Sequence, residues 1–119
     1  TVLFAILIDF VEGEKGTDQL GIDWSKDIAS GFVSQEYVDE ITAVYTEIEA
    51  AYRYAKFDRP RLQKELEGAY PDVSFNRGVQ AVGTYDEVYA DVIRIETELD
   101  TKDYWAMNVI IKNVKVLWT

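Results

Sequence analysis

The hydrophobic positions of the chain follow three different patterns, and the first is a nearly continuous apolar run. Residues 2–11 are apolar except at Asp9 and are rich in branched and aromatic side chains. The run ends in the charged, glycine-containing segment 12–16. A short apolar run without alternation, bounded by a turn, is typical of a strand that is buried on both faces. The sequence therefore predicts a buried central strand over Val2–Val11.

The second pattern is helical and predicts a pair of helices in the middle of the chain. Over roughly residues 35–56, apolar side chains recur with helical spacing at Val38, Ile41, Tyr45, Ile48 and Tyr52. Ser34 offers an oxygen that can cap this helix at its N-terminus. Pro60 suits the first helical position of a second, shorter helix, which Gly68 would end before Pro71.

The third pattern is alternation with a period of two, and it dominates the C-terminal half. Residues 73–81 suggest an interrupted strand. The segment 84–99 supports both periods, because residues 84–87 form a capping box that favours a helix. The same segment alternates apolar with charged side chains at Ile93, Ile95, Thr97 and Leu99. Its branched residues favour a strand and a hairpin. The run Tyr104–Trp118 also alternates, with a change of parity that a bulge near residues 112–113 would explain.

These elements predict an α+β fold built on one sheet. We expect an antiparallel sheet of about four strands, packed by a helical pair, in the order β-α-α-β-β-β. If residues 84–99 are helical instead, the sheet shrinks and the arrangement becomes α/β. The chain has 119 residues, the usual size of one domain, and contains no repeat, linker or low-complexity tract. We therefore expect a single domain spanning residues 1–119.

The composition removes many kinds of catalytic and cofactor chemistry. The chain has no cysteine and no histidine. Disulfides, thiol chemistry, zinc ribbons and iron–sulfur clusters are thereby excluded, and the commonest general base is missing. The hydrophobic fraction of 48% is high enough for a folded core. The sequence predicts no cofactor and favours a protein that is not an enzyme.

The net charge narrows the range of partners. Twenty-two acidic residues against twelve basic ones give a net charge of −10. This charge repels nucleic acid phosphates and anionic lipid, so neither nucleic acid nor membrane is an expected partner. The longest apolar run, Val2–Ile8, is too short to span a membrane. We expect a cytoplasmic protein.

Two charged groups are candidate binding sites. The polar side of the first predicted helix carries Glu36, Glu40, Glu47 and Glu49. Such a face could bind a basic protein surface, as an acidic inhibitor or an assembly factor does, or serve solubility alone.

The second charged group is basic. Residues 53–64 hold five basic residues, including Arg53, Arg59 and Arg61, against one acidic residue. This cluster could grip a phosphate or carboxylate at the start of the second helix. It could also pair internally with the acidic excess, or meet the acidic face of a second copy in a homodimer.

The alternative function is a site built around Asp9. A carboxylate near the end of a buried strand is a common position for a metal ligand in α/β enzymes. With Glu12, Glu14, Asp86 or Asp91 it could hold a magnesium ion for phosphoryl transfer or hydrolysis. A small-ligand pocket enclosed by the sheet belongs to the same alternative. The leading hypothesis remains a non-enzymatic interaction protein.

Overall fold

The computed structural model describes residues 2–70 and 88–118, and these parts of the chain are built from helices and contain no strand. The predicted α+β fold with its antiparallel sheet is therefore wrong, and so is the α/β alternative. The strand expected over residues 73–81 and the capping box at 84–87 lie outside the described residues.

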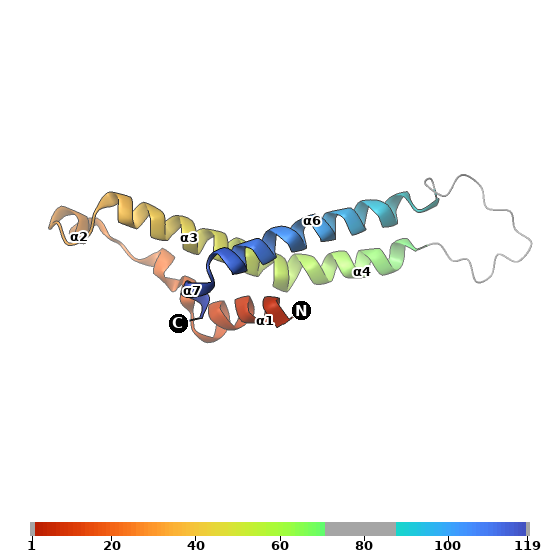
Figure 1. Ribbon diagram of the computed structural model, residues 1–119, viewed down its shortest axis with the longest axis horizontal. Coiled ribbons are helices and arrows are strands. Elements are labelled where there is room, and N and C mark those ends of the chain that lie inside the picture. Colours follow the sequence, from red (N-terminus) through yellow and green to blue (C-terminus); the bar gives the residue numbers. More distant parts are fainter. Residues whose placement is uncertain (1, 71–87, 119) are drawn as a thin grey trace, which may run out of the picture.

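A long helical hairpin forms the frame of the molecule (Figure 1). Helix α3 (Gln35–Arg53) continues through the π-helical segment η3 (Tyr54–Asp58) into α4 (Arg59–Ala69). Helix α6 (Ala90–Lys112) returns alongside them. At about 1.5 Å per residue, the continuous helix over residues 35–69 is roughly 50 Å long. Both helices predicted in the middle of the chain are confirmed, but they form one rod.

Local sequence explains where this rod begins, widens and ends. Ser34 Oγ accepts a hydrogen bond from the backbone N–H of Tyr37 at 3.1 Å, which is the predicted N-cap. Pro60 lies inside this continuous helix, directly after η3, where the wider π-helical turn already interrupts the regular α-helical hydrogen bonding that a proline cannot complete. Gly68 lies inside α4 rather than ending it. The chain leaves the helix at Tyr70, whose extended backbone is the conformation that a following proline favours.

The segment predicted as a buried strand is a helix that packs against the hairpin. It consists of α1 (Val2–Ile8) and the π-helical turn η1 (Asp9–Gly13). Phe4, Leu7 and Phe10 are buried in the common core, whereas Val2 and Ala5 are exposed. The buried positions recur every three residues, which a helix places on one side. An apolar run of this kind has no period of its own, so packing decides its structure.

The C-terminal strands predicted over residues 84–118 are also helical where the structure describes them. The buried side of α6 carries Val92, Ile95, Leu99, Ala106, Val109 and Ile110. Trp105, Met107 and Ile111 are apolar but exposed, and together with the buried Val109 they produced the apparent alternation. The irregularity expected near residues 112–113 is a break between α6 and the short α7 (Val114–Leu117).

Two short elements precede α3 at one end of the hairpin (Figure 1). The 3-10 helix η2 (Gly16–Gly21) packs on α3, and α2 (Ser25–Ala29) leads into it. Within residues 2–70 and 88–118, no helix combines the length and the apolar character that crossing a membrane requires.

Candidate functional site

The acidic face predicted on the long helix is divided between two sides of α3. Successive residues of an α-helix are turned by about 100°, so Glu36, Glu40 and Glu47 lie within about 40° of one another. Glu49 lies roughly 200° from Glu47, across the apolar side that contains the buried Ile48. The four glutamates therefore do not form one surface.

Two of these glutamates are engaged by cations of the same chain. Glu47 Oε2 lies 3.1 Å from Nζ of Lys112 on α6. Glu49 Oε1 lies 3.0 Å from Nη2 of Arg53, one turn later on α3. Glu36 and Glu40 are exposed, and neither has a cation partner in the described part of the chain. These two carboxylates are the ones that remain available to another molecule.

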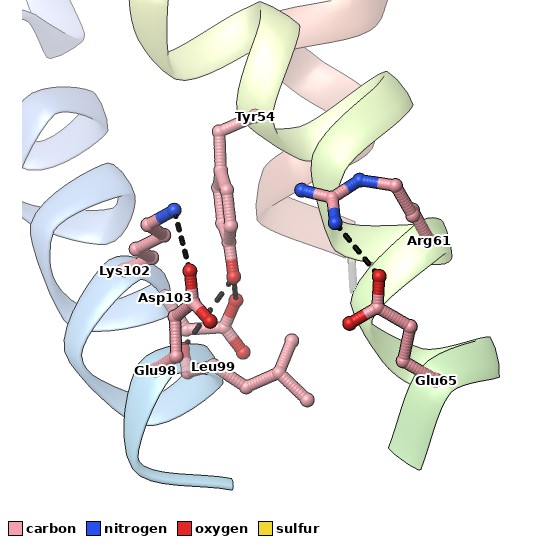
Figure 2. Close-up of polar contacts among 7 residues, drawn as sticks. All are labelled: Tyr54, Arg61, Glu65, Glu98, Leu99, Lys102 and Asp103. Carbon is pink, nitrogen blue, oxygen red and sulfur yellow. Dashed lines mark hydrogen bonds and ion pairs between the residues drawn. The ribbon is translucent and has the colours of Figure 1, made fainter. Parts of the chain in front are cut away.

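Most of the predicted basic cluster, including all three of its arginines, is paired within the fold. Besides the Arg53 pair, Arg61 Nη1 donates to Glu65 Oε1 at 2.8 Å (Figure 2). Arg59 binds Asp103 of α6. Because α3, η3 and α4 are one helix, the turn around Pro60 does not present a helix N-terminus to a phosphate. The arrangement supports internal pairing rather than an anion site.

Asp103 is the centre of a polar cluster in the seam between the rod and α6. Arg59 donates from Nε and Nη2 to the two oxygens of Asp103, at 2.9 and 3.2 Å. The Tyr54 hydroxyl donates to Asp103 Oδ1 and lies 3.4 Å from the backbone oxygen of Leu99 (Figure 2). The Arg59 guanidinium also lies over the ring of Phe4, 5.1 Å from its centroid. This cluster ties α1, η3, α4 and α6 together.

Tyr54 and Arg59 both keep their protons in this cluster, as expected for groups with a structural role. Burial raises the pKa of Tyr54 far above its ordinary value, and the hydrogen bond to Asp103 acts in the same direction. The hydrogen bond to Asp103 also raises the pKa of Arg59. A tyrosine that keeps its proton beside a fully paired carboxylate is a poor general base or nucleophile. Sequence reasoning missed this cluster because Asp103 falls between the two segments predicted as strands, residues 84–99 and 104–118.

A second, exposed cluster fixes the end of η1 to the rod. Glu12 Oε2 accepts hydrogen bonds from Lys56 Nζ and, at 2.6 Å, from the Tyr52 hydroxyl. The hydrogen bonds from Lys56 and Tyr52 lower the pKa of the Glu12 carboxyl. The hydrogen bond to Glu12 raises the pKa of Tyr52 and that of Lys56. Glu12 is thus committed to a contact within the chain.

The alternative site around Asp9 finds no geometric support. Asp9 lies at the start of η1 and is exposed. Asp91 lies at the start of α6, and its oxygen is 3.8 Å from Arg94 Nε. Asp86 lies outside the described residues. Across residues 2–70 and 88–118, no group of three acidic side chains could hold a metal ion.

Known proteins were compared with the chain at three levels. Protein-family models, curated proteins and solved structures give no match. The function therefore has to be inferred from the charges and surfaces of the chain itself.

Helix α3 extends beyond the end of α6 (Figure 1), and its apolar side is only partly buried there, although η2 packs on this part of α3. Helix α6 ends at Lys112, which pairs with Glu47, and the chain breaks direction at Asn113 before α7. The apolar side of α3 continues past this point. With Gln19 of η2 and Val116 of α7 it forms a groove of about 430 Å³. The α3 residues that line the groove are Tyr37, Glu40, Ile41, Val44 and Tyr45.

Proposed function

We propose that the chain is a protein-interaction module without a catalytic centre, and that it binds a basic partner through the acidic end of its helical hairpin. Residues 16–46 make up this end, which comprises η2, α2 and the first half of α3 (Figure 1). They carry six acidic residues and one basic residue, a net charge of −5. A surface of one sign selects partners of the opposite sign and accelerates their encounter.

The observation that carries the proposal is the contrast between paired and unpaired carboxylates. Glu49 and Glu65 farther along the rod, and Asp103 on α6, each have an arginine partner. Glu36 and Glu40 have none among the described residues. Two carboxylates without a cation partner on one side of α3, within a segment whose net charge is −5, favour an acidic inhibitor or an assembly factor. Such a protein covers a basic surface and needs no reactive group.

Comparative capture from lysate of the producing cells tests this proposal. The bait is the full chain, and the test variant carries Glu36→Lys with Glu40→Lys. The control carries Glu67→Lys with Asp100→Lys, which changes the net charge equally at exposed positions on α4 and α6. We expect proteins captured by the unaltered chain to be lost with the test variant and retained with the control.

Two outcomes would contradict the proposal. One is equal capture by both double variants, because the acidic end would then have no special role. The other is an affinity for the captured protein that stays constant while ionic strength rises several-fold, because exposed charges are screened over about 10 Å at 0.1 M salt.

A further inference from the structure

We infer that the groove at the end of α6 is the docking site for an amphipathic helix of the partner, with apolar residues on one face and lysine or arginine on its flanks. This inference rests on the proposed function and makes it specific. The proposed function specifies only the charge of the partner, whereas this inference also specifies that the partner binds through a helix and through apolar residues.

The shape of the groove indicates a helix. Over the second half of α3, the apolar side is covered by α6, which packs alongside it. Toward the N-terminus of α3, the same side continues through Val44, Ile41 and Tyr37, but α6 has ended. The stretch from Tyr37 to Tyr45 that α6 does not cover is about 12 Å long, or roughly two helical turns. An incoming helix would occupy the space into which α6 would extend, and amphipathic helices bind such grooves through residues spaced three and four apart.

The groove keeps apolar side chains accessible to this helix. Tyr37 is 49% exposed, and Ile41, Val44 and Tyr45 are only half-buried. By contrast, Ile48, one turn after Val44, is fully buried beneath the helices that pack there. The apolar side of α3 is therefore fully buried around Ile48 and only partly buried toward Tyr37.

The charge at the edge of the groove indicates a basic occupant. Glu40 lines the groove, and Glu36 lies one turn before it on the same side of α3. An adjoining depression shares Gln19, Tyr45 and Val116 with the groove and adds Glu14 and Lys115. Three carboxylates against one ammonium give this edge a negative charge. An apolar floor with an acidic edge complements an amphipathic helix that carries cations beside its apolar face.

Two model peptides separate the apolar contribution from the charge. The first is a helical 15-residue peptide with leucines at positions i, i+3, i+7 and i+10 and six lysines on its other face. The second has serine in place of each leucine and the same charge. We expect the leucine peptide to bind the full chain at least tenfold more tightly, because burying even one leucine is worth about tenfold or more in affinity.

Variants locate the peptide on the surface. Ile41→Ser with Val44→Ser should weaken the leucine peptide about tenfold and leave the serine peptide unchanged. The control, Ile93→Ser, removes an exposed isoleucine of α6 and should change neither affinity. Carbodiimide coupling of the peptide lysines to the unaltered chain should give cross-links at Glu36 and Glu40, which requires no variant to fold.

The outcomes distinguish this inference from the proposed function. If both peptides bind equally, or if the cross-links fall elsewhere while Glu36→Lys with Glu40→Lys still abolishes partner capture, the groove inference is overturned and the acidic-end proposal stands. If that double variant changes neither peptide binding nor partner capture, both are overturned.

Discussion

Replacing Asp103 with asparagine is the sharpest test of how the hairpin is held together. Asp103 lies in the apolar seam of α6, one turn after Leu99 and one turn before Ala106. The substitution keeps the side-chain shape but removes the charge that faces Arg59 and weakens the acceptor for the Tyr54 hydroxyl. Arg59 is then left without a counter-charge in a half-buried position.

The size of the effect follows from the exposure of the pair. The side chains of Arg59 and Asp103 are 21% and 25% exposed. Exposed ion pairs contribute up to about 1 kcal/mol, and breaking a fully buried pair costs about 3–5 kcal/mol. We therefore expect Asp103→Asn to lower the free energy of unfolding by about 2 kcal/mol. Tyr54→Phe, which removes one hydrogen bond, should lower it by about 1 kcal/mol.

Urea unfolding followed by circular dichroism measures these differences. The matched control is Glu65→Gln, because Glu65 and Arg61 form an exposed pair whose side chains are 44% and 56% exposed (Figure 2). That change should cost less than about 0.5 kcal/mol. Replacing both partners, Arg59→Met with Asp103→Leu, should cost less than Asp103→Asn alone, because no unpaired charge remains. A loss for Asp103→Asn no larger than that for Glu65→Gln would refute the reasoning.

Two further predictions concern pH and glycine. The contacts with Lys56 hold the pKa of Glu12 below 4.5, so the carboxylate stabilises the fold above that pH, and the contribution is lost as pH falls through the lowered pKa. Glu12→Gln should lower the urea midpoint near neutral pH, and the difference from the unaltered chain should vanish in acid; a constant difference would contradict this. Gly16→Ala should destabilise the fold, because the new Cβ would lie 2.1 Å from the buried Phe10 ring, which packs in the core. The added Cβ of Gly68→Ala meets open space inside α4, so this change should raise the thermal midpoint and the free energy of unfolding, the latter by up to about 1 kcal/mol. Equal effects of the two changes on the thermal midpoint would show that packing at Gly16 is unimportant.

The parts of the fold that could be predicted are those with an unambiguous local signal. Ser34 and the 3.6-residue spacing that follows it defined the start and the buried side of α3. The uneven distribution of the four glutamates on α3 was also available from helical geometry, since Glu47 and Glu49 cannot share a side.

The remaining elements depend on contacts that a single sequence does not display. Residues 2–11 are apolar on all sides, so only their packing against the hairpin shows that they are helical. In α6 the apolar stripe is obscured twice, because Asp103 interrupts the buried side and Tyr104, Met107 and Ile111 add apolar residues to the exposed side. The partners of Asp103, Tyr54 and Arg59, lie more than forty residues earlier in the chain. A pairing of that kind cannot be seen from spacing.

The π-helical turn η3 sets the rotational phase of everything that follows it in the rod. Its closing hydrogen bond joins the N–H of Arg59 to the oxygen of Tyr54, one residue farther back than in an α-helix. Deleting a single residue from this turn would leave a sequence fully competent to form a helix, yet α4 would be rotated by about 100° about its axis. Leu62 would leave the core and Arg59 would turn away from α6. The one additional residue in η3 therefore sets the rotation of α4 relative to α3, so that the apolar sides of both face the core.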